Sequence, residues 1–118
     1  PEDRKVMKTH VKEGRRILLE NGLVMTALIA HGHHSFDIID PYPLESDLLP
    51  YPSELSSPGA RLNVMLNTRM VSLADVYDAF HRPNILLTGP EIKRKMIEKN
   101  PDQTYFILEL YKAGIFEE

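Results

Sequence analysis

Residues 58–80 read PGARLNVMLNTRMVSLADVYDAF, and this stretch decides the fold class. Its apolar residues recur at spacings of three and four, the period of one face of an α-helix. Ser57 and Pro58 mark a helix start, because serine caps unpaired amides and proline suits the first helical position. Pro83 ends any continuation. We therefore expect a helix over 58–80 whose buried side is made of Leu62, Met65, Leu66, Met70, Leu73, Val76 and Tyr77.

The same helical period appears on both sides of this stretch. It predicts helices over 2–20, 23–31, 90–99 and 103–113. Asn21 and Gly22 separate the first two, because glycine readily adopts the left-handed conformation that ends a helix. No segment sustains the apolar-polar alternation of a strand. The sequence therefore predicts an all-α fold of about five helices, forming a single domain over 1–118.

A proline-rich segment interrupts the helices at 35–58. Proline removes an amide donor and fixes its own backbone angle, which disfavours both helix and central strand. We expect this segment to be a lid or a surface loop and the most mobile part of the chain. Five of the nine prolines lie in it: Pro41, Pro43, Pro50, Pro52 and Pro58.

Composition excludes several classes of function. The 118 residues include 14 Lys and Arg against 17 Asp and Glu, a net charge of -3 that argues against DNA binding. The absence of cysteine excludes disulfides and thiolate sites. The longest apolar run, residues 23–30, is too short to span a membrane. Without a secretion signal, we expect a cytoplasmic location. The chain begins at Pro1 rather than methionine, so we expect it to be part of a longer protein.

Histidines supply the first candidate for chemistry. His31, His33 and His34 lie within four residues, and His10 lies on the apolar side of the first predicted helix. Imidazole is the commonest metal ligand, and neighbouring helices can bring such side chains to one ion. The alternatives are a solvated polar cap for the cluster and a hydrogen-bonded core histidine for His10.

Asp75 supplies the second candidate. It falls beside Leu73 and Val76, on the side of the helix that we expect to face inward. A buried carboxylate is costly unless it is paired or bound to a metal. Pairing with Arg69 or Arg82 is the alternative to metal binding.

Four segments together resemble HD-GYP domains, which are metal-dependent phosphodiesterases of the HD superfamily that hydrolyse cyclic di-GMP. Residues 68–80, TRMVSLADVYDAF, resemble the family's AR-I-I-x-V-A-D-x-Y-D-A-L helix. Residues 7–18, MKTHVKEGRRIL, are similar to its H-P-x-x-G-x-x-I-L helix. Residues 29–34, IAHGHH, resemble the segment with its paired histidines, and residues 41–43, PYP, fall where the family has Gly-Tyr-Pro. The resemblance covers residues 1 to about 83 and implies an HD-superfamily-like helical fold.

The resemblance also implies a site. It makes a divalent transition metal (iron, manganese, zinc or nickel) the expected cofactor and a cyclic dinucleotide or another phosphoester the expected substrate. Asp75 is the expected catalytic residue, and His31 is expected outside the cluster because helix geometry turns it to another face. The expected metal ligands are His10, His33, His34 and Asp75; the expected substrate contacts are Asp78 and Arg82 at phosphate and Tyr42 or Tyr51 at a base.

Departures from the family leave several interpretations open. The His-Asp doublet that names the superfamily is absent, Ser35 replaces a glutamate, and Pro41 replaces a glycine. The first interpretation is a phosphodiesterase that is incomplete or degenerate in this chain. The alternative is a catalytically inactive helical signalling or interaction domain, working with other signalling domains of a longer polypeptide. A structural helical bundle with a coincidental motif is the third.

Overall fold

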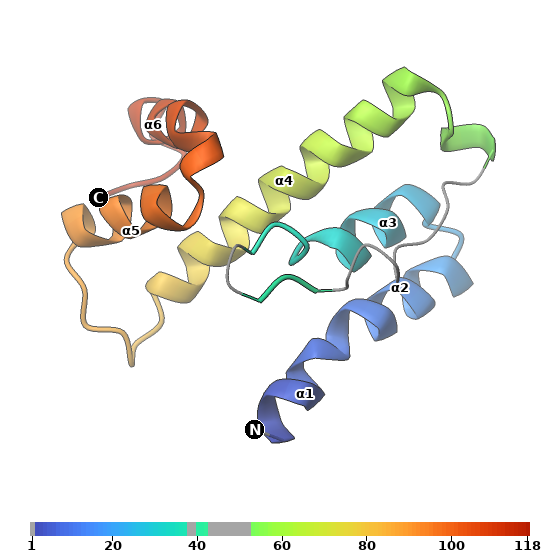
Figure 1. The fold of residues 1–118 in the computed structure, drawn as a ribbon, viewed down its shortest axis with the longest axis horizontal. Helices are drawn as coiled ribbons and strands as arrows, with labels where there is room; N and C mark the ends of the chain where they lie inside the picture. The colour runs from blue at the N-terminus through green and yellow to red at the C-terminus, as the bar shows by residue number, and fades with distance from the viewer. Residues whose placement is uncertain (1, 38–39, 43–52) are drawn as a thin grey trace. The chain divides into compact units, whose positions relative to one another are not determined.

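The computed structural model describes residues 2–37, 40–42 and 53–118, and every regular element in them is helical (Figure 1). This confirms the all-α class. None of the described helices is both long and apolar enough to cross a bilayer. Half of the segment 35–58, including Tyr51, lies outside this description, and the mobility expected of the segment stays a prediction. The elements are α1 Glu2–Lys8, α2 His10–Glu20, α3 Val24–Gly32, η2 Ser53–Leu55, α4 Pro58–Phe80, α5 Gly89–Lys99, η3 Pro101–Gln103 and α6 Thr104–Lys112.

The chain divides into two compact units, Pro1–Ser72 and Leu73–Glu118. The long helix α4 contributes its first part to the first unit and its last part to the second. The single domain expected from the sequence stays a prediction.

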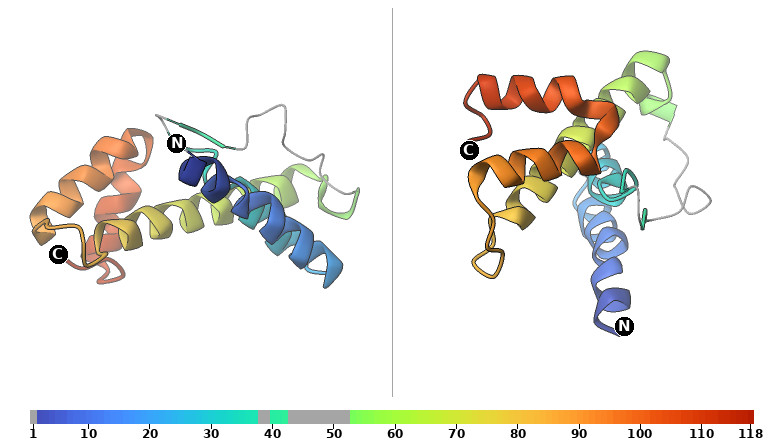
Figure 2. Two further views of the ribbon diagram at one scale, coloured as in Figure 1. Left: turned by 90° about the horizontal axis from the view of Figure 1, so that it is seen from below. Right: turned by 60° about the vertical axis from the view of Figure 1, so that its left-hand side comes forward.

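In the first unit, α2 and α3 form a helical hairpin and lie side by side in all three views (Figures 1 and 2). Gly22 makes the turn with a φ of 73°, a conformation that glycine adopts without strain. Val11 and Ala27 are almost fully buried, at 2% and 0% exposure. The hairpin therefore brings the start of α2 close to the end of α3.

The single helix expected over 2–20 is interrupted at Thr9, and this expectation was wrong. The Thr9 hydroxyl donates a hydrogen bond of 2.6 Å to the Val6 carbonyl, and the Thr9 amide donates to the same oxygen. Threonine can offer the backbone such local bonds in place of helical ones. The interruption makes His10 the first residue of a new helix.

The buried face expected for α4 was also wrong in its first half. Leu62, Met65 and Leu66 are about half exposed. The buried positions are instead Val64, Thr68, Arg69 and Ser72, which are 2–6% exposed.

Polar groups on this face of α4 tolerate burial because they find partners within the first unit. The Thr68 hydroxyl donates to the Val64 carbonyl at 2.6 Å. The Arg69 guanidinium lies 4.5 Å from the centre of the Phe36 ring, a cation–π contact. Gly32 permits close approach, because a Cβ added to it would lie 3.3 Å from the Thr68 methyl carbon. The end of α3 therefore packs against the Thr68 side of α4.

The second unit has its own apolar core, formed by Leu73, Ile92, Met96, Ile107, Leu110 and Phe116. Helices α5 and α6 lie next to each other (Figure 2). Thr88 begins α5 with a capping box, in which its hydroxyl accepts from the Glu91 amide and its own amide donates to the Glu91 carboxylate. This bond from the Thr88 amide lowers the pKa of Glu91. The cap defines where α5 starts.

We expect Tyr77→Phe to lower the free energy of unfolding of the second unit by about 1 kcal/mol. The Tyr77 hydroxyl donates to the Glu117 carbonyl at 3.1 Å and accepts from the Glu117 amide at 3.0 Å. Phenylalanine would keep the stack on Phe116, where the rings lie 4.2 Å apart, and lose only these bonds. Urea denaturation followed by the Met96 methyl resonance measures the change. Tyr105→Phe, at a ring 78% exposed, should leave it unchanged, and equal effects would contradict this role.

Candidate metal centre

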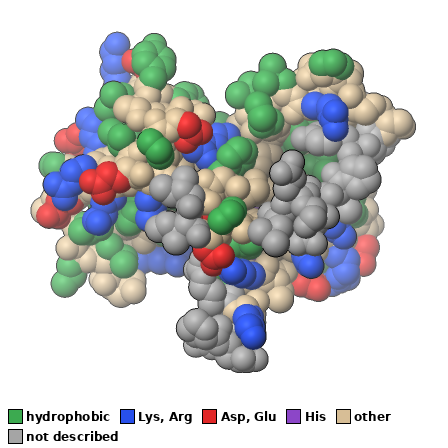
Figure 3. All heavy atoms as spheres, viewed as in Figure 1, with side chains coloured by type: hydrophobic (Ala, Val, Ile, Leu, Met, Phe, Trp, Pro, Cys, Tyr) green, Lys and Arg blue, Asp and Glu red, His purple; other side chains and the backbone are tan. Residues whose placement is uncertain are grey.

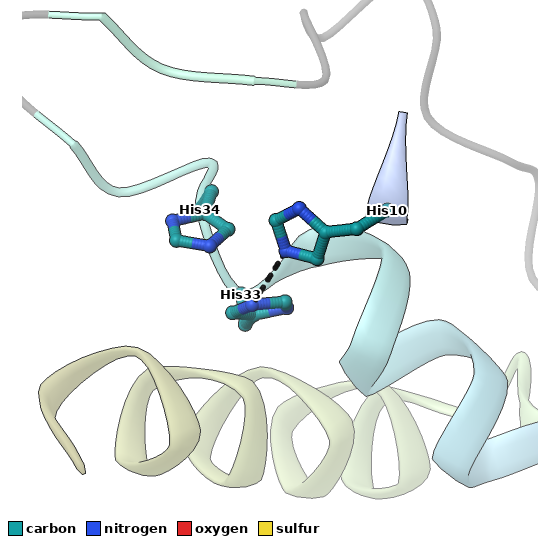
Figure 4. Close-up of side chains that lie close together, drawn as sticks. All are labelled: His10, His33 and His34. Atoms are coloured by element: carbon teal, nitrogen blue, oxygen red, sulfur yellow. Dashed lines mark hydrogen bonds between the residues drawn. The ribbon is translucent and has the colours of Figure 1, made fainter. Parts of the chain in front are cut away.

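Three histidines of the first unit come together, as Figure 4 shows. His10 comes from the start of α2, and His33 and His34 follow the end of α3. One ligating nitrogen from each ring lies within 4.8 Å of the others. The convergence expected from the sequence is confirmed, while the role of these side chains as metal ligands stays a prediction.

Hydrogen bonds fix which nitrogens face the centre of this cluster. His10 Nδ1 lies 2.5 Å from the Met7 carbonyl, and His33 Nδ1 lies 2.7 Å from the Ala30 carbonyl. A carbonyl oxygen can only accept, so both Nδ1 atoms carry the proton in these bonds. The two Nε2 atoms face each other at 3.4 Å and form a long hydrogen bond (Figure 4). An Nε2 atom without a proton has a lone pair that it can offer to an ion.

The spacing of the His10 and His33 nitrogens suits a transition metal, whereas the set of three extends to 4.8 Å, wider than the spacing of ligands around one ion. Metal-bound histidines characteristically donate their second ring N–H to a carbonyl or carboxylate, as His10 and His33 do here. Two nitrogens on a tetrahedral zinc, at about 2.05 Å from the ion, lie about 3.3 Å apart. The observed 3.4 Å agrees with that spacing.

Tyr42 holds His34 in place. The two rings stack with centroids 4.6 Å apart and planes inclined by 15°. The Tyr42 amide donates to the His34 carbonyl at 3.2 Å, which fixes the backbone next to the ring contact. Tyr42 is only 6% exposed, and its ring centroid lies 6.0 Å from that of His10, with the two rings nearly perpendicular. Its ring contacts two of the candidate ligands, His10 and His34, and its expected contact with a base stays a prediction.

An ion pair ties the Tyr42 segment to the end of α1. Lys8 Nζ lies 2.9 Å from both carboxylate oxygens of Asp40. The same ammonium lies 5.6 Å from the centre of the Tyr42 ring. The sequence analysis missed this pair, because its partners are 32 residues apart and form no local pattern.

The other predicted site residues are not part of the histidine cluster. His31 is 2% exposed and lies outside the group, as expected. Asp75 is half-buried on the part of α4 that belongs to the second unit, and Asp78 and Arg82 are exposed in that unit. Their expected roles stay predictions. Ser35, which directly follows the paired histidines, donates its hydroxyl to the Gly32 carbonyl at 2.6 Å.

Comparison with known proteins gave no match to a family model, a curated protein or a solved structure. The resemblance to HD-GYP domains therefore rests on the sequence motifs.

We expect Asp40→Asn to weaken zinc binding at the histidine cluster by about fivefold or less, because the half-exposed Lys8–Asp40 pair contributes about 1 kcal/mol or less. Losing the carboxylate charge loosens the attachment of the Tyr42 segment to Lys8, so the His34 ring is held less firmly. Calorimetric zinc titration measures the change. Glu20→Gln is the control. It likewise replaces a carboxylate by an amide, and it removes an exposed ion pair between Glu20 and Arg16, both on α2. An affinity unchanged by Asp40→Asn would show that the pair does not position the site.

Proposed function

We propose that this chain belongs to a metal-dependent phosphodiesterase of the HD-GYP type, acting on cyclic di-GMP or a related phosphoester and incomplete or degenerate in the residues present. The observation that carries the proposal is the pair of Nε2 atoms of His10 and His33, 3.4 Å apart with both Nδ1 protons committed to carbonyls. The motif resemblance supplies the reaction class.

His10, His33 and His34 would hold the ion. When bound, a divalent transition metal would lower the pKa of a water molecule that it coordinates, so that hydroxide becomes available as the nucleophile. It would also neutralise the negative charge on the phosphoryl oxygens. The Met7 and Ala30 carbonyls accept from Nδ1 of His10 and His33, which leaves the Nε2 atoms of these rings to act as ligands. Tyr42 orients His34 by stacking on its ring. Asp75 is proposed as the catalytic carboxylate and fourth ligand, and Asp78, Arg82 and Tyr42 as substrate contacts. Iron, manganese, zinc and nickel all suit imidazole ligands joined by a carboxylate.

A second candidate is a catalytically inactive signalling or interaction domain that retains the helical fold and works with other signalling domains. Two substitutions favour it. Ser35 uses its hydroxyl on the Gly32 carbonyl, where the family has a glutamate. Pro41 replaces the glycine of Gly-Tyr-Pro. Both changes lie next to the histidine cluster in the chain.

Hydrolysis of cyclic di-GMP with added manganese or iron tests the proposal. The chain and its Asp75→Ala variant are compared, with metal binding measured on each. Because these residues contain no His-Asp doublet, we expect very poor turnover by the chain itself. Weak turnover that requires the metal and falls further in Asp75→Ala supports the phosphodiesterase. Metal binding with no turnover of cyclic di-GMP or of bis(p-nitrophenyl) phosphate favours the inactive domain. Absence of metal binding overturns the metal-dependent activity.

A further inference from the structure

The second unit contains a shallow groove of about 310 Å³ between the end of α4, the segment that follows it and α5. Phe80, Ile85, Leu86 and Leu87 give it apolar walls. Lys95 and Lys99 reach it from successive turns of α5. In the space-filling view, basic, acidic and apolar side chains are intermixed over α5 (Figure 3).

Part of the apolar wall is open to water, while Phe80 and Leu87 are partly buried against the core of the second unit. Leu86 is 93% exposed, and the neighbouring Ile85 is 37% exposed. Single exposed leucines are common, but here Leu86 continues an apolar surface that includes Phe80 and Leu87. Covering such a surface removes apolar area from water, which is favourable. A ligand with an apolar body therefore fits the groove.

Two lysine side chains provide positive charge beside the apolar wall of the groove. In the part of the chain that the structure describes, neither Lys95 nor Lys99 forms an ion pair, whereas Lys93 pairs with Glu118 at 2.7 Å. The Lys99 ammonium lies 5.9 Å from the centre of the Phe80 ring, directly beside the apolar wall. Glu98 also lines the groove, and its carboxylate lies 3.7 Å from Arg94. Two lysines and one glutamate thus line the groove, which leaves one net positive charge there, and Lys95 also interacts with the Glu91 carboxylate one turn away on α5.

We propose that this groove binds a small amphiphile, with an anionic head at Lys95 and Lys99 and an apolar body against Phe80, Leu86 and Leu87. The volume is at the lower end of the range of small-molecule sites, about 300–1,000 Å³. Two lysines beside a groove are too few for a membrane surface, which is recognised by clusters of about four to eight basic residues. The chain's net charge of -3 also disfavours an anionic membrane. This inference is independent of the proposed phosphodiesterase activity.

Titration with decanoate, followed by NMR of the amides of residues 84–87, tests the site. We expect saturable shifts at these amides, and binding about tenfold weaker in Lys95→Gln/Lys99→Gln, as the loss of two partly exposed ion pairs implies. Lys112→Gln, at a side chain 79% exposed on α6, is the matched control and should bind like the original chain. Decanol and acetate, each lacking one half of the ligand, should both bind much more weakly.

Two results would overturn the inference. The first is decanoate binding that is equal in the double variant and the original chain, because the lysines would then play no part. The second is an absence of decanoate binding together with sedimentation on vesicles of phosphatidylglycerol and phosphatidylcholine, which would assign the surface to a membrane. Saturable decanoate binding without sedimentation supports a small-molecule site.

Discussion

His33→Ala is expected to weaken zinc binding by about 100-fold or more, since a lost ligand exceeds the effect of a lost outer-shell partner, itself about 10–100-fold. His33 supplies the Nε2 atom that lies 3.4 Å from His10 Nε2, and its Nδ1 proton is already committed to Ala30. Alanine leaves the site with His10 and His34 only. Calorimetric titration against a competing chelator measures the affinity, and circular dichroism verifies that the helices persist.

His81→Ala is the matched control, because it removes an imidazole that lies outside the cluster and contacts Tyr77 in the second unit. Its zinc affinity should equal that of the original chain. Zinc should also raise the unfolding temperature of the original chain and of His81→Ala, but not of His33→Ala, since a ligand stabilises only the state that binds it. Equal losses of affinity in the two variants would mean that the histidine cluster is not the binding site.

The helix ends were the most predictable part of the fold, because they depend on local chemistry. Asn21 and Gly22 end α2 in the structure as they do in the sequence analysis, with Gly22 at positive φ. Pro58 starts α4 and Gly114, with a φ of 76°, follows α6. The break at Thr9 was missed because threonine is an ordinary helical residue unless its hydroxyl bonds to the preceding turn, as it does here to Val6.

Which face of a helix is buried depends on tertiary partners, and here the sequence was a poorer guide. The period of the first half of α4 indicated Leu62, Met65 and Leu66 as core. The buried residues are instead Thr68, which packs near Gly32, and Arg69, which packs on the Phe36 ring. Both contacts join residues more than 30 positions apart in the sequence, so no local sequence pattern predicts them.

The histidine cluster was predictable because two of its members are adjacent and the helical hairpin supplies the third. His31 separates from His33 and His34 since it lies on the last turn of α3, facing inward at 2% exposure. The supporting contacts were not predictable. The stack of Tyr42 on His34 and the Lys8–Asp40 pair require the chain to fold back across the turn that follows α3.

Ile107→Ala is expected to lower the free energy of unfolding of the second unit by about 3 kcal/mol, within the usual range for truncating a buried isoleucine. Ile107 is 0% exposed and belongs to the core shared with Met96 and Leu110. Alanine removes its apolar contacts and leaves a cavity that the helices fill only in part. Because small domains are marginally stable, a loss of this size leaves much of the unit unfolded at 37 °C.

Leu108→Ala is the control for this core, because the next residue on α6 is 42% exposed and its truncation should cost about 1 kcal/mol or less. Both variants place an alanine in α6, so differences in intrinsic helix propensity contribute little to the difference between their stabilities. Urea denaturation followed by the Met96 methyl resonance reports on the core directly, since Met96 is 0% exposed within it. Equal destabilisation by the two variants would mean that α6 does not bury the face of Ile107, and the core would then have to be assigned to another face of α6.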